Sequence, residues 1–495
     1  MIIKIPIENL NLDLIKKFLF SKSTVKIKDR ARKKILKSHN TLKEIIEKGN
    51  VIYGVNTGFG ALVSKKISKE EIRKLQYNLI ISHALGEGEY FDRNVVRLAI
   101  FLRANMLSKG YSGVREELIE ALLNLINKDI IPCVQKKGSV GASGDLSPLA
   151  QIGLVLLGKG KVFYNNQILA TEKVFKKEKI KPFILDIKEG LSLINGTEMM
   201  SAFLSYLLIE IENIFNLAKE ISGLTTLVTK GNKKEFDIKL HQLKPYSHQI
   251  TTAQIIYNYL NLCEFKESSI QDPYSIRCQP QILGAVGETI DFAKRILETE
   301  INSVTDNPLI IDNEIFSGGN FMGTSLALVS DLLGISLTLL SLLSERKIFY
   351  LTSGKNPELP IFLIQQPGTN SGLMMAQIVS TALAGENKIL SHPASITSLP
   401  TSANQEDIVS MGMNSLLKLE KIVENTKTIL AIEILCLSQA LRLVELNFKK
   451  KTEIIRVIEE NIPYLEEDRE LQNILSKIKA LFFRRINSKE RKTIN

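Results

Sequence analysis

The sequence predicts a mainly α-helical protein in which a long-helix bundle follows a smaller mixed N-terminal region. Beyond Gly196, apolar residues recur at helical spacing over long stretches, which favours amphipathic helices. An apolar content of 44% in a chain of 495 residues is sufficient to build a large core. We therefore expect two regions: residues 1–195, which mix helices with short strands, and residues 196–495, which form the bundle.

The N-terminal region contains short elements of both types. Residues 2–7 are typical of a strand, and apolar residues on both sides of Asn165-Asn166 predict a β-hairpin within residues 161–183. Amphipathic helices are expected at residues 30–48, 70–82, 92–108 and 114–127.

Long helices dominate the second region. The stretch from Leu326 to Leu343 is the most apolar, but Ser330 and Asp331 interrupt it, so we interpret it as a buried bundle helix and not as a membrane span. The apolar stripe of the last helix is too long for a compact single domain, which favours packing against other subunits. The expected helices cover residues 198–221, 283–301, 324–351, 373–390 and 407–446.

The net charge of +11 does not by itself indicate an anionic partner. Lysines are scattered among glutamates, apart from a short basic tail at residues 484–492, and this pattern is typical of a solvated surface. We expect neither nucleic acid nor membrane as a partner. The N-terminus lacks the apolar core of a signal peptide and the four cysteines form no CxxC pair, which favours a cytoplasmic protein. The five histidines have no metal-ligand spacing, so no metal site is expected.

The stretch from Gly138 to Leu149, Gly-Ser-Val-Gly-Ala-Ser-Gly-Asp-Leu-Ser-Pro-Leu, is a glycine-rich loop that enters a helix. Its glycines permit backbone angles closed to other residues, and Ser147 followed by Pro148 suits an N-cap and the first helical position. The stretch lacks the Gly-Lys-Ser/Thr of a phosphate loop. It also lacks the glycine that a nucleophile elbow needs two residues after its serine.

A different reaction is open to this loop. The amide nitrogen of Gly144 can attack the carbonyl carbon of Ala142 and close a five-membered ring, because the residues on both sides of Ser143 are small. Loss of two waters, one of which carries the hydroxyl oxygen of Ser143, leaves an exocyclic alkene. The product is a methylidene-imidazolone, an electrophile made without an added cofactor.

This stretch closely resembles the signature of the aromatic amino acid ammonia-lyases, and the resemblance extends over about residues 50–450. It implies a fumarase/ammonia-lyase-like helical fold and a methylidene-imidazolone formed from Ala142, Ser143 and Gly144, with no external cofactor. It also implies an amino acid substrate and a homotetramer whose pockets draw on more than one subunit.

Three further strings resemble catalytic segments of the family. Residues 53–60 alone predict only a tight loop, but their match to the catalytic-tyrosine loop makes Tyr53 the base that removes the β-proton. Asn195, in an Asn-Gly turn, corresponds to the amide that contacts the electrophile and the substrate amino group. Phe321, in the loop from residue 317 to 323, corresponds to the phenylalanine that packs beside the electrophile.

The segment from Gln271 to Gln281 matches a pocket segment of the family. The resemblance implies that Gln271 and Tyr274 line the pocket and that Arg277 holds the substrate carboxylate. A guanidinium group suits that role because its planar fork can bind both carboxylate oxygens.

The choice of substrate depends on residues that differ between branches of the family. Ser82-His83 and Glu406 resemble the histidine branch, and a carboxylate at position 406 can pair with an imidazole. Met322 resembles the tyrosine branch, and Ile408 stands where the histidine branch usually has a histidine.

The resemblance therefore implies an ammonia-lyase that converts L-histidine into urocanate. Three alternatives stay open from the sequence. A tyrosine or phenylalanine ammonia-lyase is favoured by Met322, an aminomutase would use the same electrophile, and a non-enzymatic helical structural protein would need none of these residues.

Overall fold

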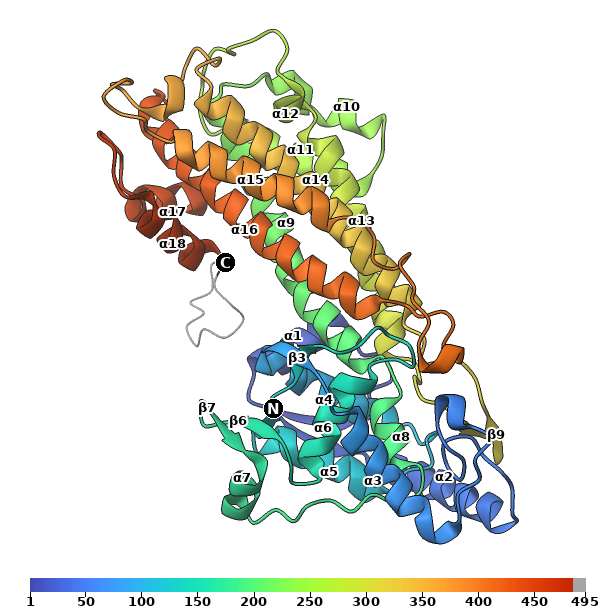
Figure 1. Ribbon diagram of the computed structural model, residues 1–495. Coiled ribbons are helices and arrows are strands. Elements are labelled where there is room, and N and C mark those ends of the chain that lie inside the picture. The colour runs from blue at the N-terminus through green and yellow to red at the C-terminus, as the bar shows by residue number, and fades with distance from the viewer. Residues whose placement is uncertain (484–495) are drawn as a thin grey trace. The chain divides into compact units, whose positions relative to one another are not determined.

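The computed structural model describes residues 1–483 and divides into two compact units, each built from several stretches of sequence. Helices dominate both units (Figure 1), which confirms the predicted mainly α fold class. The basic tail expected at residues 484–492 lies outside the described residues. Unit 1 comprises Met1–Tyr206, Lys294–Ser330 and Pro393–Leu417, and unit 2 comprises Leu207–Ala293, Asp331–His392 and the described part of Lys418–Asn495.

Short strands form small sheets in unit 1. The hairpin predicted around Asn165-Asn166 is confirmed, and both of these turn residues have positive φ angles, +48° and +61°, which asparagine tolerates well. The pairs are β1 (Ile2–Ile5) with β2 (Thr24–Ile27), parallel; β3 (Glu87–Tyr90) with β5 (Gln135–Lys137), antiparallel; β8 (Leu309–Ile311) with β9 (Glu314–Phe316), antiparallel; and β4 (Ile131–Pro132), β6 (Lys161–Tyr164) and β7 (Gln167–Ala170) in one antiparallel sheet.

Helix α4 (Arg93–Leu107) of unit 1 is buried along almost its whole length and packs against α1 (Leu12–Phe20), α5 (Glu116–Asn127) and β4. Apolar residues occur on every side of α4, as expected of a helix inside a core. The other helices are α2 (Asp29–Glu47), α3 (Ile72–His83), α6 (Leu146–Leu156), α7 (Thr171–Glu178) and α8 (Glu189–Ile194), with 3₁₀ turns η1 (Gly60–Leu62), η2 (Lys69–Glu71) and η5 (Ser402–Asn404).

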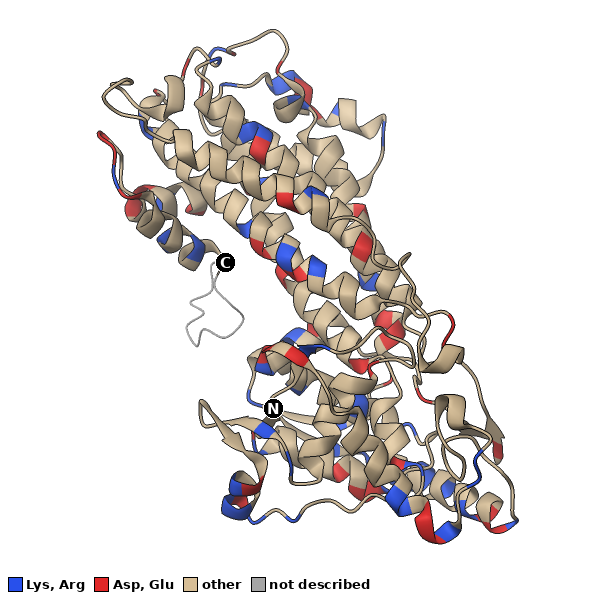
Figure 2. Ribbon diagram, in the orientation of Figure 1, with Lys and Arg blue, Asp and Glu red and all other residues tan. Residues whose placement is uncertain are grey.

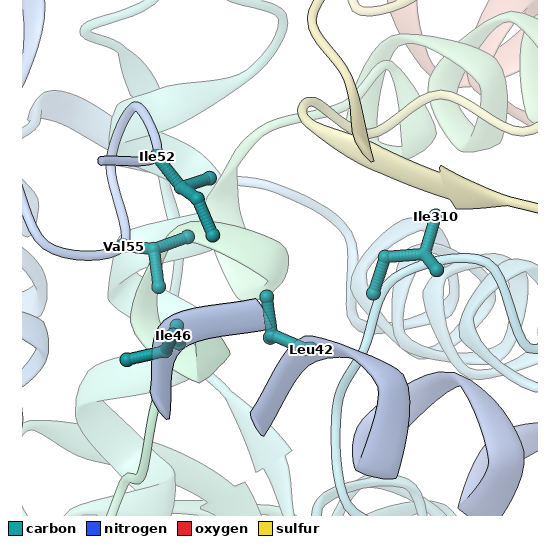
Figure 3. Packing of buried hydrophobic residues seen from close by; sticks show 5 residues of the cluster. All are labelled: Leu42, Ile46, Ile52, Val55 and Ile310. Atoms are coloured by element: carbon teal, nitrogen blue, oxygen red, sulfur yellow. The ribbon is translucent and has the colours of Figure 1, made fainter. Parts of the chain in front are cut away.

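An apolar cluster fixes the loop that carries Tyr53. Ile52 and Val55, on either side of Tyr53 in the sequence, are 5% and 0% exposed. They pack with Leu42 and Ile46 of α2 and with Ile310 of β8 (Figure 3). Burial of such side chains stabilises each by about 1.5–3 kcal/mol, so the cluster holds the start of the glycine-rich segment, where Tyr53 lies, in place.

Unit 2 is a bundle of long helices. Four of them, α9 (Glu198–Val228), α13 (Gln279–Ile301), α14 (Thr324–Thr352) and α16 (Gly412–Leu443), also contribute residues to unit 1. Lys and Arg are interspersed with Asp and Glu along the helices of each unit (Figure 2). The remaining elements are η3 (Lys233–Phe236), α10 (Ile238–Gln242), α11 (Ser247–Leu260), α12 (Tyr274–Arg277), η4 (Ile361–Leu363), α15 (Met374–Leu390), α17 (Glu453–Asn461) and α18 (Leu471–Phe482).

Among the described helices, only α14 is long and apolar enough to cross a membrane by length and composition, and 72% of its most apolar window is buried inside the protein. Polar residues of α14 bind other buried side chains of the protein. Lys347 forms a 2.8 Å ion pair with Glu433 of α16, and Ser344 donates a 2.5 Å hydrogen bond to the same carboxylate. These contacts are typical of a core helix, in which buried charges are paired.

Several helix predictions differ from the structure, including the end of α9, which continues to Val228, and the start of α13 at Gln279. The last long helix begins at Gly412 and not at residue 407, because Met411 has a left-handed φ of +54° that a helix cannot include. The helix after the glycine-rich loop begins at Leu146 with Asp145 at the N-cap position, so the prediction of Ser147 as N-cap is wrong. Helices α1, α7, α11, α17 and α18 are among those that were not predicted; the sequence of α11 is rich in Thr, Tyr, Asn and Ile, which have modest helix propensity.

Candidate active site

A cavity of about 780 Å³ in unit 1 brings together residues from five separate segments. Tyr53, His83, Ser143, Asn195 and Glu406 all line it. These are five of the residues that the sequence singles out, and they come from loops or helix ends. A concave site lined by apolar residues with a few converging polar groups is the usual form of a small-molecule site.

The loop that carries Ser143 is held closely against the Asn195-Gly196 turn. Gly144 has φ of +76° and forms an isolated parallel bridge with Gly196. A Cβ atom at Gly144 would collide with the Gly196 carbonyl oxygen, and the backbone N–H of Asp145 donates to that oxygen at 2.7 Å. Only glycine at position 144 therefore allows the loop to lie in this conformation.

The side chain of Asn195 contacts the reactive loop directly. Its Nδ2 donates to the carbonyl oxygen of Ser143 at 2.9 Å, and the side chain is 4% exposed. Its Oδ1 is buried and has no hydrogen-bond partner. A buried acceptor without a donor is costly in a folded protein, so this oxygen is an unsatisfied group of the site.

Arg103 holds the backbone of Asn195 in place, and the sequence prediction did not include this arginine. The guanidinium is 1% exposed and donates to the carbonyl oxygens of Ser192 and Asn195, the latter at 2.9 Å, while it pairs with Glu198 at 2.8 Å. An arginine inside the apolar sequence Phe-Leu-Arg-Ala was the available signal, since buried charges are rare unless paired. A second buried pair, Lys188 with Asp306 at 2.6 Å, adjoins Arg103.

Asp145 follows the reactive tripeptide and is fully buried. Its Oδ2 accepts from the backbone N–H of Met200 at 2.7 Å, and Oδ1 accepts from the Ser139 hydroxyl at 3.4 Å. Burial raises the pKa of Asp145 to about 8, although the Met200 hydrogen bond opposes this. The side chain can therefore carry a proton at neutral pH directly beside the loop.

The loop that carries Tyr53 is shaped by hydrogen bonds as well as by the apolar cluster. The Tyr53 hydroxyl oxygen accepts from the backbone N–H of Gly60 at 3.1 Å. Gln76 of α3, which the sequence prediction also missed, donates to the Gly54 carbonyl at 3.2 Å and accepts from the Leu191 N–H at 3.0 Å. This buried amide ties the tyrosine loop to α8.

His83 lies at the end of α3, and its Nδ1 is 2.9 Å from the hydroxyl of Ser82. Burial lowers the pKa of His83, although the Leu79 carbonyl and the negative charge of Glu406 oppose this shift. The imidazole is therefore neutral at pH 7 and can either donate or accept a hydrogen bond in the cavity.

Glu406 is the side chain that contacts the reactive serine. Its Oε1 accepts from the Ser143 hydroxyl at 3.1 Å, and its Oε2 accepts from the Thr401 hydroxyl at 2.6 Å. Between these two residues, η5 (Ser402–Asn404) has left-handed φ angles of +51°, +50° and +69°. Backbone strain of this kind is often found at functional sites, and here it places a carboxylate against Ser143.

The structure does not bring every predicted residue to the cavity. Phe321 belongs to unit 1, in the turn before α14, but is not among the lining residues; Met322 is beside it and Ile408 is 68% exposed. Gln271, Tyr274 and Arg277 belong to unit 2. Within the described residues, no cluster of three or more His, Cys, Asp or Glu could hold a metal ion.

A helical fold that brings a tyrosine, the serine of an Ala-Ser-Gly loop and a carboxylate to one cavity is the arrangement expected of a carbon–nitrogen lyase that acts on amino acids. The chain belongs to the aromatic amino acid lyase family, whose model matches residues 10–460.

Relatives of known name are similar over nearly the whole chain. A protein of Thermoplasma volcanium named probable histidine ammonia-lyase is 42% identical, over 97% of this chain and 98% of that protein. The crystal structure of histidine ammonia-lyase from Trypanosoma cruzi has a TM-score of 0.88 at 33% identity, over 97% and 93% of the two chains. Phenylalanine aminomutase of Pantoea agglomerans has a TM-score of 0.90 at 30% identity, over 97% and 99%.

Proposed function

We propose that this lyase eliminates ammonia from L-histidine and releases urocanate, and that its electrophile is a methylidene-imidazolone formed from Ala142, Ser143 and Gly144. The observation that carries the proposal is the contact of Glu406 with Ser143 at the cavity that also contains His83. A carboxylate beside the reactive position is the group that would recognise an imidazole.

The residues around the tripeptide fit the ring. Gly144 has the positive φ and the close approach to Gly196 that exclude a side chain, and Asn195 already donates to the carbonyl oxygen of Ser143. The ring would supply an electrophilic carbon that makes the substrate's ammonia a better leaving group. Asn195 would hold its carbonyl oxygen, and Arg103 would hold Asn195.

The other residues of the chain would bind the substrate and move one proton. Tyr53, as the phenolate, would take the β-proton at its phenol oxygen, and the amino group would leave as ammonia. Arg277 would hold the substrate carboxylate through its fork of N–H groups. Glu406 would accept from the imidazole N–H, while the Thr401 hydroxyl keeps the carboxylate oriented.

Substrate choice gives the test of this proposal. Replacing Glu406 with glutamine should lower kcat/KM for histidine much more than for tyrosine, because an imidazole N–H then loses its carboxylate partner. A phenyl ring would leave buried polar groups unpaired, at about 1–3 kcal/mol for each group. Two such groups predict that the wild type prefers histidine over tyrosine or phenylalanine by roughly ten- to a few-thousandfold. Release of unsaturated product from histidine, tyrosine and phenylalanine measures this directly; Glu459→Gln, a change on α17, is the matched control.

A tyrosine or phenylalanine ammonia-lyase, or an aminomutase, is the second candidate. Met322 favours the tyrosine branch, and the similarity to a phenylalanine aminomutase fits an enzyme that returns ammonia to the β-carbon. Wild-type protein that prefers tyrosine, or equal losses on both substrates in Glu406→Gln, would favour this candidate. Detection of a β-amino acid would identify an aminomutase.

We also propose a cytoplasmic homotetramer whose sites combine several subunits. Arg277 belongs to a different unit from the cavity, and α14 exposes Leu328, Leu332, Ile335 and Leu339 by 38–54% at helical spacing. An exposed apolar stripe of this kind favours a helix–helix interface. Sedimentation should give a tetramer that carries all of the activity, and a fully active monomer would contradict shared sites.

A further inference from the structure

Two carboxylates of unit 2 lie together where the segment that carries Arg277 begins. Asp272 directly follows Gln271, precedes α12 and is 4% exposed. Its backbone N–H donates to Oε1 of Glu235 in η3 at 3.0 Å. The Glu235 side chain therefore links η3 to the start of the Arg277 segment.

The two carboxylates differ in how their oxygens are used. Asp272 accepts from the backbone N–H of Asn232 at 2.7 Å and from the Ser269 hydroxyl at 2.6 Å. Glu235 Oε2 is buried and has no partner. An ionised oxygen buried without a donor is costly, whereas a protonated one can donate to the neighbouring carboxylate. Burial, reinforced by the charge of Asp272 and opposed by its N–H, raises the pKa of Glu235 to about 7.

Arg277 is coupled to these carboxylates. Its guanidinium lies 4.6 Å from the ring centre of Tyr274, and its positive charge acts on Glu235. When the side-chain amide oxygen of Gln271 faces Arg277, it accepts hydrogen bonds from Nη2 at 2.7 Å and from Nη1 at 2.8 Å. The buried Nε of Arg277 has no partner. The guanidinium is thus held by neutral groups and is within the field of the carboxylates.

We propose that Glu235 and Asp272 share one proton and act as a positioning pair that keeps Arg277 available to the substrate carboxylate. The inference rests on the proposed role of Arg277. Loss of the shared proton gives the pair a second negative charge, which attracts the guanidinium and competes with the substrate. Substrate binding therefore weakens when the pair loses its proton, while the chemical step is unaffected.

The other charged and titratable groups nearby do not produce this effect. Burial lowers the pKa of His241, whose Nε2 is 3.1 Å from the Glu235 carbonyl, so it is neutral at pH 7 and above. Burial raises the pKa of Tyr350, which also feels the charge of Asp272, so it stays protonated up to pH 9. Three further charged groups are held in contacts of their own: Glu267 accepts from the Lys233 backbone N–H, the Lys233 ammonium lies over the Phe265 ring, and Lys230 is paired with Glu358.

The test compares Glu235→Gln, which is permanently neutral, with the wild-type tetramer in steady-state kinetics from pH 6 to pH 8.5. The substrate titrates identically in both assays, so the ratio of the two KM values isolates the pair. We expect the wild-type KM to rise relative to that of the variant by roughly fivefold, with an unchanged ratio of kcat values. Asp272→Asn should give the same result if Glu235→Gln does not fold.

The melting temperature provides a readout that does not depend on Arg277. The folded-state pKa of Glu235 is raised above its usual 4.5, so the group stabilises the fold below about pH 4.5 and this contribution is lost as the pH rises through about 7. Glu235→Gln should therefore gain melting temperature relative to wild type between those values and differ by a constant amount above them. A constant difference throughout would overturn the shared proton.

The two proposals fail in different ways. Arg277→Lys should raise KM strongly if Arg277 binds the carboxylate. No change in that variant would overturn the role of Arg277 and leave the melting result standing. A raised KM in Arg277→Lys together with a KM ratio that does not change with pH would overturn the positioning pair alone.

Discussion

Ser143→Ala protein will retain less than about one thousandth of the wild-type rate of ammonia release, since removal of a covalent catalytic group costs on the order of 10³-fold or more. Without the hydroxyl, the side chain cannot lose water to form an alkene. The substitution removes only one oxygen atom, and the hydrogen bond it breaks, to Glu406, is part of the site and not of the core. The measurement is product formation at saturating substrate.

The control for this variant is Ser68→Ala, an exposed serine outside the cavity, which should keep full activity. Both proteins should have the wild-type melting temperature within about 2 °C. Normal turnover by folded Ser143→Ala would show that the electrophile is made elsewhere or is not used.

Tyr53→Phe will reduce kcat by roughly 10²- to 10⁴-fold, the usual contribution of a general base. Ile52 and Val55 keep the loop packed in their apolar cluster, and the substitution removes only the hydroxyl that accepts from Gly60. KM should change little because the ring and the cavity remain. Steady-state kinetics on the preferred substrate measures both parameters.

Tyr77→Phe is the matched control, since Tyr77 is on α3, is 40% exposed and does not line the cavity. The mass of Tyr53→Phe should still be lower than its sequence mass by two waters, because the base acts after the ring has formed. A normal kcat in this variant would assign the β-proton to another group.

Much of the fold could be predicted because helical periodicity is a local property. The long helices α9, α14 and α15 were placed to within a few residues, apart from the C-terminal end of α9, and so was the hairpin at Asn165-Asn166. The start of α16 was not, because the left-handed backbone at Met411 depends on contacts with residues distant in sequence, such as the Met411 N–H to Val140 carbonyl bond of 2.9 Å.

Residues of the site could be predicted where they belong to short sequence motifs. Residues that act through contacts between distant segments could not. Tyr53, His83, Ser143, Asn195 and Glu406 were singled out from local motifs, and one cavity collects them. The supporting network was not predicted: a single arginine or glutamine in a helical sequence gives no indication of its partner. Arg103 binds Asn195, which is 92 positions away in the sequence, and Gln76 binds Leu191, which is 115 positions away. Only the folded chain shows these contacts.

The most direct test of the central claim is the mass of the wild-type protein, taken intact and then after proteolysis. The account predicts a chain two waters lighter than its sequence, with the whole loss in the peptide that contains Ala142, Ser143 and Gly144. An active wild-type protein of unmodified mass would contradict the account, because the cavity would then contain an ordinary serine and no electrophile.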